Sequence, residues 1–216
     1  MSKSIIDEGF RHELVEGAVF EGPYDIPVIQ PLPDTVPLPV ALLPFDKRRL
    51  TGDLHQWVHC YLFDTRFSQL ITQTEKYATE IARFDGAISP DPSLYRDMPI
   101  ATQIANTYLN RAVGHYLQRL GMPVICNVRW SDDRSFPFAF DGAPRHNTVA
   151  VSNHGCMRSR EDRYWFARGF DEMLVQLDPK RVVLHGIMPQ ELLERYNGTV
   201  EIRHYPSSFS SSRKAA

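Results

Sequence analysis

The stretch PIATQIANTYLNRAVGHYLQRLGMPVICNVRW (residues 99–130) decides the fold class. Its first part repeats apolar side chains at helical spacing, and Gly121 ends the helix that this spacing predicts over 99–120. Its second part, 123–130, is a short apolar run with little alternation, which is typical of a strand covered on both faces. A helix that leads directly into such a strand indicates an α/β protein, because parallel strands need long crossovers.

The same alternation of strand and helix extends to both sides of this stretch. The sequence predicts strands at 55–62, 84–89, 123–130, 148–152, 181–186 and 200–205, and helices at 67–82, 99–120, 160–177 and 189–196. Two architectures fit these parallel-strand β/α repeats: an incomplete TIM-like barrel and, as the alternative, an open doubly wound sheet. We favour the barrel because polar residues follow almost every predicted strand, whereas a doubly wound sheet concentrates them at one switch point.

Composition divides the chain into three parts. Residues 1–46 hold seven of the 16 prolines, which fix the backbone and remove amide donors, so a long helix or a central strand is excluded there. Apolar residues within this part favour a Pro-rich, extended arm that lies on the surface of the domain. We expect an α/β domain over 47–206 and a disordered, serine-rich tail over 207–216.

The overall composition is that of a globular protein of ordinary size. Its 216 residues include 24 Lys and Arg against 26 Asp and Glu, and a net charge of −2 gives no general attraction to nucleic acid or anionic lipid. Three cysteines without C-x-x-C spacing are typical of a reducing compartment. The charged N-terminal region does not resemble a signal peptide, and no apolar run approaches the ~20 residues of a membrane span. We therefore expect a cytoplasmic protein with no membrane partner.

The polar residues after the strands predict a ligand site at the carboxyl edge of the sheet, where both architectures place one. Histidine exchanges protons near neutral pH, and an arginine beside a tryptophan can clamp a phosphate and stack a base. The predicted catalytic residues are His154, His185 and Asp85. The predicted ligand-binding residues are Asp91, Asn127, Arg129, Trp130 and Asn153.

No metal site is predicted, although Asp85, Asp91 and Asp97 could share a Mg²⁺ ion. Each of these residues has a structural explanation, because Asp91 opens a turn before a proline, Asp97 caps a helix and Asp85 precedes a glycine. The sequence contains neither zinc-ligand spacings nor the glycine-rich motifs of the usual nucleotide cofactors, so no cofactor is identified. Cys156 follows a glycine just before a helix, where a thiol pKa is lowered, and is a further candidate nucleophile.

Several segments are similar to a known family. SPDPSLYRDMP (89–99) and the N-x-R-W pattern at 127–130, with TVAVSNHGC (148–156) and VVLHG (182–186), resemble the domain of unknown function 4417 family. The resemblance covers about residues 55–190 and implies a cytoplasmic α/β protein of the kind found in bacteria, phages and mobile elements. It brings no catalytic residue with it.

Two classes of function are consistent with these observations. The first is an enzyme that acts on a small anionic ligand, a nucleotide or a phosphorylated metabolite, at the strand ends. The alternative is a non-catalytic binding protein of a mobile element that contacts nucleic acid or a host protein, with basic groups in 129–163 and at Arg213 and Lys214. The net charge counts against DNA. A partner that docks on the Pro-rich arm is a third option, and the oligomeric state is left open.

Overall fold

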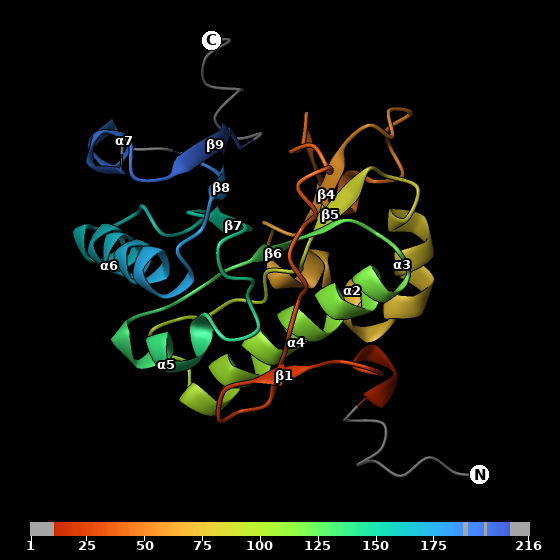
Figure 1. Ribbon diagram of the computed structural model, residues 1–216, viewed down its shortest axis with the longest axis horizontal. Helices are drawn as coiled ribbons and strands as arrows, with labels where there is room; N and C mark the ends of the chain where they lie inside the picture. The colour runs from red at the N-terminus through yellow and green to blue at the C-terminus, as the bar shows by residue number, and fades with distance from the viewer. Residues whose placement is uncertain (1–10, 188–189, 197, 208–216) are drawn as a thin grey trace.

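Seven parallel strands form the central sheet of the computed structural model, which describes residues 11–187, 190–196 and 198–207 (Figure 1). The strands lie in the sheet in the same order as in the chain, and every neighbouring pair is parallel. They are β3 (Leu42–Pro44), β4 (Trp57–His59), β5 (Gly86–Ile88), β6 (Val124–Asn127), β7 (Thr148–Ser152), β8 (Arg181–His185) and β9 (Glu201–Tyr205).

Helices connect these strands from β4 onward. They are α2 (Ser68–Thr72), α3 (Thr74–Ile81), α4 (Ile100–Arg119), α5 (Phe136–Ala139), α6 (Arg160–Leu177) and α7 (Gln190–Tyr196). Among the described residues, none of the helices is both long enough and apolar enough to cross a membrane.

The sheet curls because its helices lie on one side. Successive parallel strands joined by right-handed crossovers keep their helices on the same face, and the sheet bends around the other face. Figure 1 shows an arc of strands from β4 to β9, with α3, α4, α5 and α6 outside it. This half-barrel confirms the predicted incomplete TIM-like barrel. It excludes the doubly wound sheet, in which the strand order would reverse at a switch point.

Side chains alternate between the two faces of the curled sheet. On β7, Val149 and Val151 join the core beneath the helices, and Ala150 points into the curve. The inner layer is the smaller of the two, and the sheet contributes to it the buried side chains Trp57, Ile88, Ile125, Ala150, Val183 and Tyr205. Burial on both faces is the reason that these strands are apolar with little alternation.

The Pro-rich N-terminal region contributes to the inner layer and is not confined to the surface. It includes a short 3₁₀ helix, η1 (His12–Leu14), and an antiparallel pair, β1 (Phe20–Glu21) and β2 (Ile26–Pro27). Residues 28–41, called the inner strap below, then pass across the concave face of the sheet, where Leu32 is 2% exposed. Asn147 exchanges hydrogen bonds in both directions with the Leu32 backbone, at 2.8 and 3.1 Å.

The inner strap leads into β3, a strand that the sequence did not predict. β3 forms the edge of the sheet beside β4, and Pro44 is tolerated there because an edge strand leaves one side of its backbone unpaired. The sheet therefore begins within the predicted arm, and the boundary between 46 and 47 stays a prediction. The predicted tail at 207–216 lies outside the described residues, apart from Ser207.

One predicted helix is divided in two. The sequence predicts a single helix over 67–82, and the structure breaks it at Gln73, between α2 and α3. Gln73 has a non-helical backbone (φ −133°, ψ 50°), and the buried Thr74 hydroxyl donates to the Ile71 carbonyl, as the Arg11 guanidinium also does. These bonds satisfy a carbonyl that a continuous helix would have paired within its own backbone.

Candidate functional site

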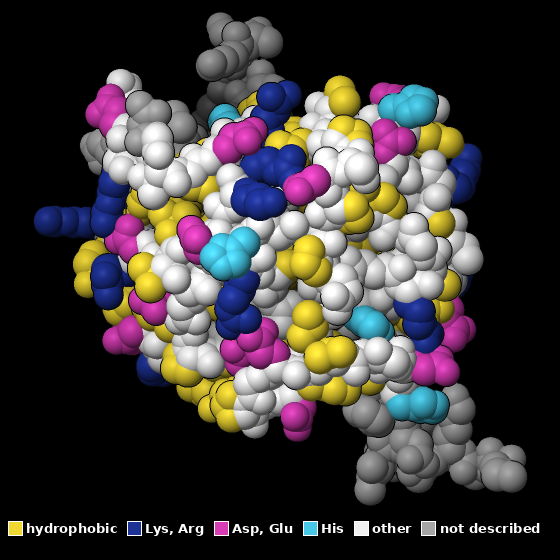
Figure 2. Space-filling model, viewed as in Figure 1, with side chains coloured by type: hydrophobic (Ala, Val, Ile, Leu, Met, Phe, Trp, Pro, Cys, Tyr) yellow, Lys and Arg dark blue, Asp and Glu magenta, His cyan; other side chains and the backbone are white. Residues whose placement is uncertain are grey.

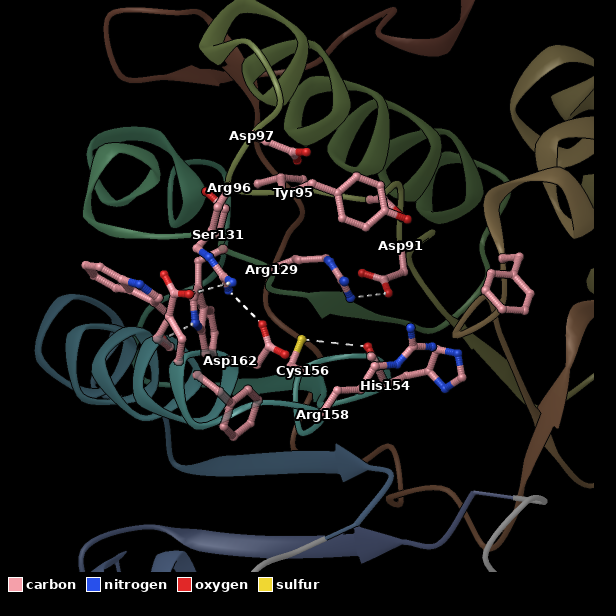
Figure 3. Close-up of a pocket in the computed structure, with 18 of the residues that line it drawn as sticks. Asp91, Tyr95, Arg96, Asp97, Arg129, Ser131, His154, Cys156, Arg158 and Asp162 are labelled. Atoms are coloured by element: carbon pink, nitrogen blue, oxygen red, sulfur yellow. Dashed lines mark hydrogen bonds and ion pairs between the residues drawn. The ribbon is translucent and has the colours of Figure 1, made fainter.

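A cavity of about 500 Å³ opens at the carboxyl ends of β5, β6 and β7 (Figure 3). Its walls come from the loops that follow these strands, from the loop after β4, and from the first turns of α6. Loops after parallel strands converge at one edge, so the cavity lies at the edge where the sequence predicts a ligand site. Its volume is within the range of roughly 300–1,000 Å³ that is typical of small-molecule sites.

Asp91 and Arg129 form the floor of this cavity. Their side chains are 6% and 14% exposed, and Arg129 Nη1 lies 2.9 Å from Asp91 Oδ2. Asn127 Nδ2 donates to the other carboxylate oxygen of Asp91 at 2.8 Å. Burial alone would lower the pKa of Arg129, but the Asp91 carboxylate opposes this effect and the pKa stays above its ordinary value. The floor therefore holds a permanent guanidinium charge.

The Arg129 guanidinium retains donors that the described residues do not use. Asp91 accepts from Nη1, Nε is buried with no hydrogen-bond partner, and Nη2 makes no hydrogen bond among the described residues. A guanidinium carries five N–H donors in a planar fork that fits the oxygens of a phosphate or carboxylate. An anionic group in the cavity would add hydrogen bonds to this side chain without displacing Asp91.

Behind the floor, a polar and aromatic network fills the inner face at the ends of the strands. Tyr61 Oη donates to Asn127 Oδ1 at 3.2 Å, and the Tyr61 ring stacks on His185 with a centroid distance of 4.8 Å. His59 completes the cluster, with its ring centroid 4.6 Å from that of His185. His185 is 5% exposed, and burial, with smaller contributions from His154 and His204, lowers its pKa to about 4. Asn127 and His185 therefore support the floor from behind and do not line the cavity.

His154 does line the cavity, as the sequence predicts. It follows β7, and its backbone N–H donates to Ser152 Oγ at 3.1 Å, which fixes the start of the loop. The half-buried ring meets Phe63 edge-to-face at 6.1 Å. Burial, then Arg129 and Arg158, lowers the pKa of His154, while Asp91 opposes the shift. The ring is thus neutral at pH 7 and lies beside two cations.

Trp130 and Asn153 serve mainly to hold neighbouring segments. Trp130 borders the cavity, but its Nε1–H donates to the Trp165 carbonyl at 3.0 Å, and its ring lies against Gly169 of α6. Asn153 is buried, and its side-chain amide bonds the Ile187 backbone in both directions, with Ile187 N donating to Oδ1 at 3.0 Å. Asn153 therefore ties the loops after β7 and β8 together outside the cavity.

The sequence predicts Asp85 at the carboxyl edge of the sheet, and this position is wrong. Asp85 directly precedes β5, so it lies at the amino edge of the sheet, opposite the cavity. Its exposed carboxylate is 3.4 Å from His55 Nδ1. A strand that starts at Gly86 carries only the residues after Ile88 to the carboxyl edge, and among the three predicted catalytic residues only His154 reaches the cavity.

Several cavity residues were absent from the predicted site; they belong to α6 or to the loops after β4, β5 and β7. Ser159 caps α6 in a capping box with Asp162, and Arg96 reaches across to Asp162 at 2.9 Å and to Glu161 at 3.5 Å. The additional lining residues include Phe63, Tyr95, Arg96, Arg158, Asp162 and Trp165. The spacing of 162 and 165 along one face of the predicted helix was the signal available in the sequence.

Cys156 also borders the cavity, but its chemistry does not match that of a nucleophile. The side chain is half-buried, and burial raises the pKa of its thiol despite the opposing effect of Arg129. Because the thiolate is the reactive form, this thiol is less reactive than an exposed one at pH 7. Among the residues that the structure describes, no three His, Cys, Asp or Glu side chains gather as metal ligands would.

Comparison with known proteins gives a family match and two phage relatives. The model of the family described as "Domain of unknown function (DUF4417)" matches residues 18–206, which confirms the resemblance and extends it into the N-terminal region. The Gene 1 protein of Mycobacterium phage D29 is 32% identical over 160 residues, covering 73% of this chain and 57% of that protein. The Gene 1 protein of Mycobacterium phage L5 is 30% identical over 195 residues, covering 88% of this chain and 82% of that protein. No solved structure matches the chain.

Proposed function

The chain belongs to the domain of unknown function 4417 family, and we propose that it binds a small anionic ligand, a nucleotide or another phosphorylated metabolite, in the cavity at the ends of β5 to β7. The observation that supports this proposal best is the group formed by Arg129, Arg158 and His154, called the basic corner below. Figure 3 shows Arg158 beside His154, with Arg129 above them. Both guanidinium groups act on the His154 ring.

The charges around the basic corner favour one anionic group there. The nearest carboxylate, Asp91, is already bound by Arg129 and Asn127. Its charge therefore does not compensate that of the Arg158 guanidinium. Arg158 is exposed and can turn toward a ligand. A neutral imidazole between the two cations can donate a hydrogen bond to a phosphate oxygen or accept one from a phosphate hydroxyl.

The acidic residues of the cavity lie on its other side. Figure 3 places Asp97 and Asp162 away from His154, and Arg96 binds Asp162 across that side. An anionic group would be repelled by these carboxylates and attracted to the basic corner, so the cavity has a preferred orientation for a ligand with one charged end.

If the cavity is an active site, His154 is the residue that we expect to transfer a proton to or from the ligand. Of the residues in the basic corner, it is the one whose ordinary pKa lies near neutrality, and the neutral ring that burial maintains can act as a base. His185 is buried behind Tyr61 and Asp85 is at the opposite edge, so neither takes part in that step.

Thermal unfolding with a panel of nucleotides and sugar phosphates tests the proposal. A ligand that binds the folded state raises the Tm by mass action. We expect stabilisation of the wild type and of Arg168→Ala, whose exposed side chain lies farther along α6 and does not line the cavity. We expect little or none for Arg158→Ala. An unchanged Tm across the panel, or equal shifts in the two variants, contradicts the proposal.

The alternative of nucleic-acid or host-protein binding has less support in the structure. Two arginines of the segment 129–163 are already in ion pairs, Arg134 with Asp132 at 2.8 Å and Arg145 with Glu21 at 2.6 Å. Figure 2 shows basic and acidic side chains interspersed on the face drawn there. A binding signal for duplex DNA or RNA at low salt, unaffected by Arg158→Ala, would favour this alternative.

A further inference from the structure

We infer that the ligand of the cavity is a nucleotide, whose base lies against Tyr95 and Trp165 while its phosphate occupies the basic corner. This inference rests on the proposed function and narrows it. A phosphorylated metabolite without an aromatic ring would use the basic corner alone.

The first support is the aromatic lining of the cavity. Tyr95 is 54% exposed at the rim of the cavity, so its ring is accessible to a ligand there. Trp165 reaches the cavity from α6, and the ring contact described for it is with its neighbour Tyr164, edge-to-face at 5.1 Å. Each ring therefore has a face that a planar ligand could cover. Stacking on aromatic side chains is the common way in which proteins hold a nucleobase.

The second support is the position of these rings relative to the charges. Trp165 lies one helical turn after Asp162, which Figure 3 places on the opposite side of the cavity from His154. Tyr95 lies near Arg129 and Asp91, between the two ends. A phosphate in the basic corner would thus leave the rest of the ligand extending past Tyr95 toward Trp165.

The third support is the acidic side chain at the base end. Asp97 is exposed on the rim near Tyr95, and its carboxylate has no hydrogen-bond or ion-pair partner among the described residues. A carboxylate accepts hydrogen bonds from the N–H groups of a base and repels a phosphate. The two ends of the cavity therefore differ in the way that the two ends of a nucleotide do.

Isothermal titration calorimetry with the four common nucleoside 5′-monophosphates, ribose 5-phosphate and inorganic phosphate tests this inference. At least one nucleotide should bind the wild type about tenfold or more tightly than ribose 5-phosphate, since stacking on aromatic rings adds to the affinity. Tyr95→Ala and Trp165→Ala should each weaken nucleotide binding about tenfold and leave ribose 5-phosphate unchanged. Tyr95→Phe, which keeps the ring, and Tyr24→Ala, which removes an exposed ring outside the cavity lining, should bind as the wild type does.

The outcomes separate this inference from the proposed function. If ribose 5-phosphate binds as tightly as every nucleotide, and Arg158→Ala weakens all of them alike, the ligand is an anion without a required base and the inference is wrong while the proposed function stands. If the removal of either ring has no effect on nucleotide affinity, the inference is also wrong. If none of the compounds binds the wild type, both fail.

Discussion

Arg129 and Asp91 join the ends of two neighbouring strands by an ion pair of 2.9 Å that is mostly buried beneath the cavity. The pair holds the cation that the proposed ligand would meet, and Asn127 fixes the carboxylate from the other side. Two opposite charges can be buried as a pair, but burying either charge without its partner lowers the stability of the folded protein.

Asp91→Asn should therefore destabilise the protein strongly. The substitution leaves the Arg129 guanidinium buried without a counter-charge, and the free energy of unfolding should fall by about 3 kcal/mol. Arg129→Met should have a similar effect by isolating the carboxylate, and the double variant should be more stable than the sum of the two losses predicts. Urea denaturation at pH 7 measures all three. The control is Arg145→Met, which breaks a half-exposed pair with Glu21 and should change stability little. Additive losses in the double variant would contradict the coupling.

The buried imidazole cluster predicts a loss of stability in mild acid. The pKa of His185 is about 4 in the folded protein, below the ordinary value of 6.5 that the unfolded chain would show. As the pH falls below 6.5, the unfolded chain takes up a proton that the folded protein does not, so stability is lost between pH 6.5 and 4. The loss attributable to His185 approaches about 3 kcal/mol. Burial also lowers the pKa of His59, so His59 too makes the folded protein less stable as the pH falls.

Denaturation curves at pH 7, 6 and 5 test this dependence. His185→Gln keeps a hydrogen-bonding side chain near Ser152 and should show a shallower decrease in stability than the wild type. His12→Gln replaces a histidine whose side chain is 81% exposed, and it should leave the decrease unchanged. A decrease that is the same in His185→Gln and the wild type would contradict the assignment to His185.

The order of elements could be predicted from the sequence, whereas the contents of the concave face could not. Periodicity identifies β4 to β9 and the principal helices, since each buries an apolar face against its neighbours. Leu32 and its neighbours carry no periodic pattern, because the inner strap is irregular and is held by side-chain bonds from Asn147. A contact between residues 115 positions apart is set by tertiary packing, which local sequence does not encode.

The same distinction explains which site residues were predicted. Asp91, Arg129 and His154 were found because a residue just after a parallel strand must lie at the carboxyl edge. His185 satisfies that rule too, but it alternates with Leu184 and so faces the inner layer, where Tyr61 covers it. Trp165 was missed because a helix contributes to the cavity only if its first turn is placed over the strand ends, and that placement depends on Arg96 and Asp162.

The inner strap should contribute measurably to stability through Leu32. This side chain is 2% exposed in the layer that includes Trp57, and Leu32→Ala should lower the free energy of unfolding by about 3 kcal/mol. Asn147→Ala leaves the Leu32 backbone groups without their partners and should cost about 2 kcal/mol. Val40→Ala, at a position 84% exposed in the same strap, is the matched control and should be nearly neutral. Equal stability of Leu32→Ala and Val40→Ala would show that the strap does not pack into the sheet.

Anion binding in the basic corner should be coupled to the protonation of His154. In the free protein, burial, Arg129 and Arg158 lower the pKa of this ring, so it is neutral at pH 7. A bound anion offsets the two guanidinium charges and raises that pKa, and binding therefore takes up protons between the free and bound pKa values. It follows that affinity rises as the pH falls through that interval, by up to about tenfold for each unit by which the pKa is raised.

Sulfate is the appropriate probe for this coupling because its own charge does not change in the relevant range. Calorimetry in two buffers of different ionisation enthalpy measures the number of protons taken up on binding. The wild type should take up a fraction of a proton at pH 6.5, and His154→Gln should bind sulfate with no uptake and with an affinity that does not vary with pH. His146→Gln, which replaces an exposed histidine paired with Asp178 outside the cavity, should behave as the wild type does. If His154→Gln retains the full uptake, another group accepts the proton, and His154 has no role in holding the anion.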